Sequence, residues 1–238
     1  MVLIPWKTTG CNCFQISGTP FENTTAKHST MKHKKLTLAI LALGLMAFGD
    51  PYKHVKNVES LGNFHARVDN YMPFKPGEKL EFRIHYGFIN AGSASMEVKQ
   101  SSVNGKPTYN LIGKGQSEGT FDWFFKVRDT YESYFDYYKV APYLFKRDVN
   151  EGGYIIKRDI RFNQETKIAT VEDFKYNTTK EFSFGDVQDM ISAFYYLRTI
   201  NTDTINMGDE VDLNMFFDAK TFAFKLKFLG KEYIKTKF

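Results

Sequence analysis

The stretch Leu80-Glu81-Phe82-Arg83-Ile84-His85-Tyr86-Gly87-Phe88 decides the fold. Every second residue in it is apolar, and this alternation is typical of a β-strand with one buried face and one face in water. Similar alternation returns towards the C-terminus, in residues 94–98, 128–138, 144–149, 154–162, 211–217 and 222–228. The sequence therefore predicts a domain of short antiparallel strands.

Turn-forming residues separate these runs. Asn104-Gly105 suits the positive φ angles of a tight hairpin, and Asn150-Glu151-Gly152-Gly153 is placed to join the arms 144–149 and 154–162. The sequence also predicts turns at Asn90-Ala91-Gly92 and Asp218-Ala219-Lys220. A weaker strand starts at Tyr109 and is expected to bulge or bend at its glycines, Gly113 and Gly115, and two more short strands are expected at 167–173 and 180–184.

One segment, residues 186–200, has helical spacing instead. Met190, Ile191, Phe194 and Leu197 recur every three or four residues, and either Asp186 or Asp189 can serve as the N-cap. The predicted fold class is mainly β: an antiparallel curved sheet or open β-barrel with one amphipathic helix packed on it. The 23 Phe and 14 Tyr fit a sheet that closes over a wide apolar interior, either packed or hollow.

An export signal begins at an internal methionine. Met31-Lys32-His33-Lys34-Lys35 is basic, and the 13 apolar residues 36–48 follow it. This run is shorter than the roughly 20 residues of a membrane-spanning helix, and Ala47 and Gly49 suit a cleavage site. We expect a signal peptide at 31–49, cleaved after Gly49, and a periplasmic or otherwise exported protein; an uncleaved anchor or a buried helix is the alternative.

The signal peptide sets the other boundaries. Residues 1–30 are then an upstream start-site artefact or disordered, residues 50–73 a polar arm or linker, and residues 74–238 a single antiparallel β domain. The chain stops inside what resembles another strand, so we expect the domain to be truncated at its C-terminus.

Composition limits the function classes. The two cysteines, Cys11 and Cys13, lie upstream of the signal peptide, so the mature chain has no disulfide or thiol nucleophile. Removal of residues 1–49 takes away five of the 32 basic and one of the 27 acidic residues, which leaves a net charge of +1. This balance does not favour nucleic-acid binding, and the mature chain contains no apolar run that would span a membrane.

The sequence gives no catalytic or metal motif. The mature chain has only His54, His65 and His85, without metal-ligand spacing, and it lacks nucleophile-elbow, phosphate-loop and dinucleotide patterns. Asp186 and Asp189 are explained more simply by helix capping than by acid–base chemistry. We predict a protein that is not an enzyme and needs no cofactor, and hydrolysis is the least supported activity.

The dipeptide Arg-Asp occurs three times, at Arg128-Asp129, Arg147-Asp148 and Arg158-Asp159. Neighbours on a strand point to opposite faces. In a curled sheet these arginines could bind an anionic head group from an inner position. The alternative is cross-strand ion pairing between the dipeptides of the two hairpin arms.

The segment Phe121-Asp122-Trp123-Phe124-Phe125 has no clean period and is either a short helical turn or an aromatic plug. Two functions remain open. One is an exported carrier that binds a lipid or other hydrophobic ligand within the curved sheet. The other is an envelope scaffold or assembly module that binds other proteins through the sheet edge or through this segment, with Trp123 and Phe124 as contacts.

Several motifs together resemble a known bacterial family. They are Pro76-Gly77-Glu78-Lys79-Leu80, Tyr86-Gly87-Phe88-Ile89-Asn90-Ala91-Gly92, Lys126-Val127-Arg128-Asp129-Thr130-Tyr131-Glu132-Ser133, Glu151-Gly152-Gly153 and Phe194-Tyr195-Tyr196-Leu197-Arg198. The chain is similar over about 74–238 to the family called domain of unknown function 3108. This resemblance implies an exported envelope protein of Gram-negative bacteria with a mostly β fold, no established activity and further C-terminal strands; it transfers no site residues.

Overall fold

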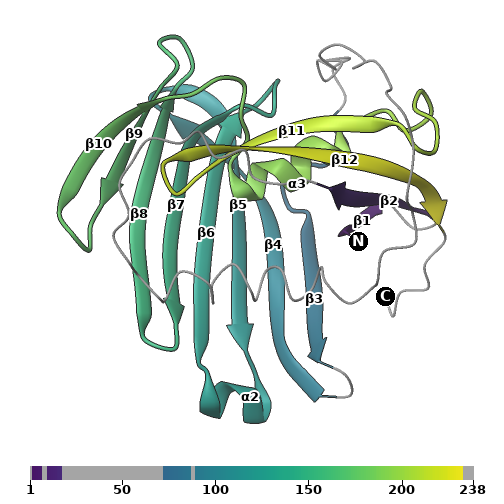
Figure 1. Ribbon diagram of the computed structural model, residues 1–238. Helices are drawn as coiled ribbons and strands as arrows, with labels where there is room; N and C mark the ends of the chain where they lie inside the picture. Colours follow the sequence, from purple (N-terminus) through teal and green to yellow (C-terminus); the bar gives the residue numbers. More distant parts are fainter. Residues whose placement is uncertain (1, 7–9, 18–71, 87–88, 233–238) are drawn as a thin grey trace. The chain divides into compact units, whose positions relative to one another are not determined.

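A computed structural model describes residues 2–6, 10–17, 72–86 and 89–232 (Figure 1). The strands are β1 (Val2–Trp6), β2 (Gly10–Ser17), β3 (Lys79–Tyr86), β4 (Ile89–Val103), β5 (Lys106–Ser117), β6 (Val127–Asp136), β7 (Pro142–Glu151), β8 (Tyr154–Asn163), β9 (Ile168–Asp173), β10 (Thr178–Ser183), β11 (Glu210–Phe217) and β12 (Lys220–Glu232). The helices are α2 (Gly119–Phe124) and α3 (Met190–Arg198). The chain divides into a larger unit of residues 66–201 and 213–223 and a smaller unit of residues 1–65, 202–212 and 224–238.

The larger unit contains a sheet of eight antiparallel strands in sequence order, from β3 at one edge to β10 at the other (Figure 1). Each strand pairs with the one before it, so the sheet is a meander whose two edges do not meet. The predicted mainly β fold is confirmed, and of the two forms that the sequence left open the structure has the curved open sheet.

Successive connections of the meander lie at alternate ends of the sheet, because neighbouring strands run in opposite directions. The connections β3–β4, β5–β6, β7–β8 and β9–β10 lie at one end, which also carries α2 and which we call the α2 end. The connections β4–β5, β6–β7 and β8–β9 lie at the opposite end. In Figure 1 the α2 end of the sheet is the lower one.

Two predictions about glycines were wrong, because Gly92 and Gly113 each lie close to a residue that is distant in sequence. The predicted turn at Asn90-Ala91-Gly92 lies within β4, where a Cβ on Gly92 would collide with the carbonyl oxygen of Gln116 on β5. The bulge predicted at Gly113 and Gly115 is also absent, because β5 pairs with β4 and with β6 without a register shift at either glycine. A Cβ on Gly113 would come within 2.9 Å of the Ile191 side chain, so this glycine makes room for α3.

The helix predicted at 186–200 is confirmed as α3, and Asp189 rather than Asp186 is its N-cap. The Asp189 carboxylate accepts hydrogen bonds from the backbone N–H groups of Ile191 (2.9 Å) and Ser192 (2.8 Å), and the Ser133 hydroxyl on β6 donates to its other oxygen (2.5 Å). These bonds fix the start of α3 to the sheet, where the helix contacts β5 and β6.

The core of the larger unit lies between the sheet and α3 and is rich in aromatic rings. Phe74, Tyr109, Phe135 and Tyr195 pack edge-on or tilted, with ring centroids 4.8–5.9 Å apart. Phe162, Phe184 and Phe216 form a second group further along the sheet. Large buried side chains therefore fill this region.

In the smaller unit, β2 pairs with β12 and β1 pairs with β2. Residues 2–6 and 10–17 therefore form strands that pair with each other and with β12. Translation from Met31 stays a prediction. The signal peptide, most of the arm 50–73 and the strand expected at the end of the chain, residues 234–238, lie outside the described residues. No helix in the described part of the chain is long and apolar enough to cross a membrane.

Candidate functional site

Exposed aromatic side chains gather at the α2 end of the eight-stranded sheet. Trp123 and Phe124 on α2 are 83% and 74% exposed, and Tyr176 between β9 and β10 is 66% exposed. We call the following set the aromatic edge: Phe121, Trp123, Phe124, Tyr154, Phe174 and Tyr176, all exposed. Among the described residues in the connections of the opposite end, the exposed large hydrophobic residue is Tyr138. The two ends of one sheet therefore present different surfaces.

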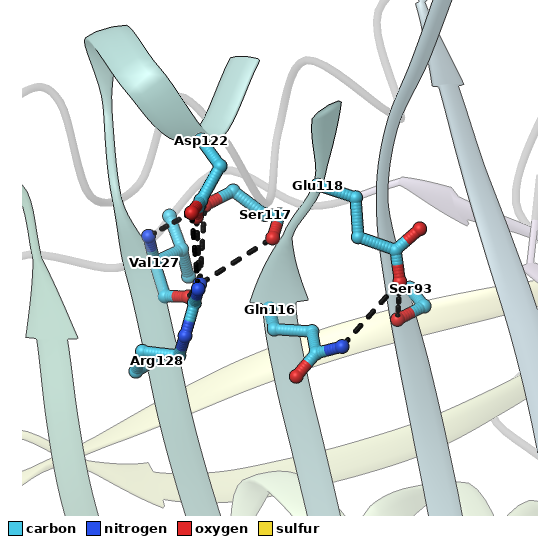
Figure 2. Close-up of polar contacts among 7 residues, drawn as sticks. All are labelled: Ser93, Gln116, Ser117, Glu118, Asp122, Val127 and Arg128. Atoms are coloured by element: carbon cyan, nitrogen blue, oxygen red, sulfur yellow. Dashed lines mark hydrogen bonds and ion pairs between the residues drawn. The ribbon is translucent and has the colours of Figure 1, made fainter. Parts of the chain in front are cut away.

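Helix α2 is a short helical turn, one of the two forms that the sequence allowed, and a polar clamp holds it (Figure 2). Arg128 on β6 makes a bidentate pair with Asp122, with N···O distances of 2.7 and 3.0 Å. The Ser117 hydroxyl donates to the same carboxylate and accepts from the backbone N–H of Val127 (2.8 Å). The arginine and the serine hold the pKa of Asp122 down at about 2, so it is charged at neutral pH. Trp123 and Phe124 thus project from a fixed base.

A second set of bonds ties the start of α2 to β4. The Glu118 carboxylate accepts from the Ser93 hydroxyl (2.5 Å) and from the Asn90 amide (3.1 Å), and the Glu118 N–H donates to the Ala91 carbonyl (3.0 Å). Figure 2 shows Glu118 reaching across to Ser93. The side-chain hydrogen bonds from Ser93, Gln116 and Asn90 lower the pKa of Glu118, the Ser93 bond most of all. Both ends of the α2 connection are therefore anchored.

The connections at the α2 end also touch one another. The Gly152 N–H between β7 and β8 donates to the Lys126 carbonyl (2.8 Å), and a Cβ on Gly152 would lie 2.5 Å from the Phe125 ring. The Lys175 ammonium lies 5.3 Å above the Tyr154 ring and 5.5 Å above the Tyr176 ring, and it donates to the Ile155 carbonyl (3.2 Å). The aromatic edge is thus continuous from α2 to the β9–β10 connection.

The three predicted arginines lie apart in two places. Arg128 belongs to the clamp of α2, whereas Arg147 and Arg158 lie directly opposite each other on β7 and β8. The expected pairing between the two Arg-Asp dipeptides was wrong, because the register sets arginine against arginine. Asp148 faces Lys157, and Asp159 faces Lys146.

The partner of Arg147 and Arg158 is a third segment. Both donate to one oxygen of Asp218, at 2.5 and 2.9 Å, and Arg158 also pairs with Asp173 on β9. Arg147 is 3% exposed and lies 4.3 Å above the Phe217 ring. Carboxylates of the chain thus occupy the positions where an anionic head group would bind, and we assign both arginines to the fold.

A carboxyl pair lies beside Arg147. Burial and the nearby, hydrogen-bonded Asp129 raise the pKa of Glu151 to about 7, and burial also raises the pKa of Asp129. The Asn150 N–H donates to Asp129 (3.0 Å). Within the described residues, no group of three or more histidine, cysteine or acidic side chains is arranged to hold a metal ion. His85 lies exposed on β3.

Sequence reasoning found only part of the aromatic edge. Trp123 and Phe124 stand out as a run of aromatics, but Tyr154 starts β8, and Phe174 and Tyr176 lie in the β9–β10 connection. The signal that could have joined them is the order of the strands, because every second connection of a meander falls at the same end.

Comparisons with known proteins place the chain in a family. Its residues 81–238 match the family described as Protein of unknown function (DUF3108). Comparison with curated proteins and with solved structures gave no significant match. Since the family match covers well over half of the sequence, the chain belongs to the DUF3108 family.

Proposed function

We propose that this protein is an exported, non-enzymatic module that docks on another component of the cell envelope through its aromatic edge. The single observation that carries the proposal is that six exposed aromatic side chains gather at one end of the sheet, whereas the connections of the opposite end expose Tyr138. Large exposed apolar patches on folded domains are typical of interaction sites. The basic stretch and apolar run 31–48 support export.

The clamp of α2 supports the same function. A site whose side chains are already held in place loses less conformational entropy when it binds. Arg128, Ser117 and Glu118 fix the base from which Trp123 and Phe124 project. The aromatic rings of the core fill the space between the sheet and α3, which favours docking at the edge over carriage inside the sheet.

Site-specific photo-crosslinking in cells tests this function. A photoreactive phenylalanine analogue at position 123 should give a crosslinked product with an envelope component. The same analogue at Tyr138, which is 59% exposed at the opposite end, should not. Equal products from both positions, or none from position 123, would refute docking through the aromatic edge.

A second candidate function is carriage of a lipid or other hydrophobic ligand within the curved sheet. One observation favours it: a Cβ on Gly115, in β5, would meet no atom within 4 Å, so there is open space beside this strand. Native mass spectrometry of protein purified without detergent tests it. A reproducible bound mass that extracts into organic solvent would support a carrier, and a clean apo mass would count against it.

A further inference from the structure

We propose that the component bound by the aromatic edge is the interfacial layer of a phospholipid bilayer with anionic head groups; this inference rests on the proposed docking function. The mixture of side chains is the first reason. Trp and Tyr favour the boundary between water and lipid, because each ring combines an apolar body with a polar N–H or O–H. Trp123, Tyr154 and Tyr176 are of this kind, and Phe121, Phe124 and Phe174 accompany them.

Charge is the second reason. Two connections of the aromatic edge carry an exposed lysine, Lys126 after α2 and Lys175 between β9 and β10, and a third exposed lysine, Lys157, lies within β8. The nearby acids on the α2 connection are already engaged, Asp122 by Arg128 and Glu118 by Ser93 and Asn90. The exposed Lys126 on the same connection can therefore attract lipid phosphates, and Lys175, which also donates to the Ile155 carbonyl, adds to this attraction, as basic residues do near an anionic membrane surface.

Shape is the third reason. The aromatic edge consists of three protruding connections along one side of a sheet. Since neighbouring strands lie about 4.8 Å apart, the row from β6 to β10 extends roughly 20 Å. Three separate connections can all contact a flat and fluid bilayer surface, because the aromatic rings of each connection can insert between lipid head groups independently. A protein partner would need a surface complementary in shape to all three connections, so we favour the bilayer.

The test uses the chain's own fluorescence. The sequence contains two tryptophans, Trp6 and Trp123, so in the full chain with Trp6→Phe the emission reports on the aromatic edge alone. Vesicles of phosphatidylethanolamine with about a quarter phosphatidylglycerol should shift this emission to the blue. Lipids brominated in their acyl chains should quench it. The apolar run 36–48 could bring the protein to vesicles by itself, but it would not bury Trp123.

Matched variants sharpen the result. In the same Trp6→Phe chain, Phe124→Ser with Tyr176→Ser should raise the lipid concentration that half-quenches Trp123 at least tenfold, whereas Tyr138→Ser at the opposite end should leave it unchanged. These side chains are exposed, so all the proteins should keep the same unfolding midpoint. Vesicles without anionic lipid should bind more weakly.

The outcomes separate this inference from the proposed function. An emission that no vesicle shifts or quenches would overturn the inference. If position 123 then still crosslinks to a protein in cells, docking stands with a protein as the partner. If position 123 gives no crosslinked product, docking fails as well.

Discussion

Asp189 combines two tasks at a buried position of the larger unit, since one oxygen caps α3 and the other accepts from Ser133. Burial raises its pKa from 3.8 to about 6. The folded pKa thus exceeds the unfolded value, so the contribution of Asp189 to stability is full below pH 3.8 and declines as the pH rises to about 6.

Two substitutions separate the cap from the charge. Asp189→Asn keeps an oxygen for the two N–H groups and removes the buried charge, so it should abolish this pH dependence and lose little stability at pH 7. Asp189→Ala should cost about 1–3 kcal/mol because it leaves the helix start uncapped. Urea unfolding of the three proteins between pH 4 and pH 7 measures both effects. Equal losses in both variants would contradict this account.

Asp218 neutralises two arginines that face each other, and it lies in a turn at a φ of 49° that asparagine also tolerates. Asp218→Asn should therefore keep the turn but remove the carboxylate partner of the buried Arg147, while Arg158 keeps Asp173, with a loss of about 1–3 kcal/mol. Adding Arg147→Met should restore part of that loss, because it removes the buried charge and keeps an apolar stem. A double-mutant cycle by urea unfolding checks this coupling, and strictly additive losses would argue against it.

At the scale of elements, two adjacent glycines of the β7–β8 turn offer a matched pair. Gly152 and Gly153 both have positive φ, 56° and 88°, but only at Gly152 would a Cβ meet the Phe125 ring. Gly153→Ala should cost about 1 kcal/mol of backbone strain. Gly152→Ala should cost more, and it should also speed amide exchange across 121–126, because Phe125 must move. Hydrogen exchange of both variants checks this, and identical exchange would show that the connections move independently.

Elements with local signals could be predicted from the sequence. The spacing of Ile191, Phe194 and Leu197 predicted α3, and Asn104-Gly105, with φ of 50° and 76°, predicted the β4–β5 turn. Gly92 could not be placed in the same way, because its close approach to Gln116 joins residues on different strands. The partner Asp218 was missed for the same reason: it lies 71 residues from Arg147.

At the scale of the whole molecule, the pH should tune the charge of the aromatic edge. Glu151 lies at this end with a pKa raised to about 7 by burial and by Asp129, so it gains its charge as the pH rises through neutrality. In the Glu151→Gln variant this gain is lost. The variant should bind anionic vesicles more tightly than the wild type at pH 8, and the two proteins should converge at pH 5.5. Vesicle titrations at both pH values measure this, and a difference that does not change with pH would exclude Glu151 as its source.

The match between strand order and sequence order in the larger unit has a consequence for assembly. Each new strand can pair with the strand that precedes it in the sequence. Because the connection between them is short, closing it costs little conformational entropy. The sheet can therefore add strands one at a time as the chain emerges from its N-terminus. The helix arrives after the sheet, and its bond from Asp189 to Ser133 spans 56 residues. Helix α3 can therefore cover the sheet only after β6 has been made, and a chain interrupted before α3 would leave part of the apolar face of the sheet uncovered.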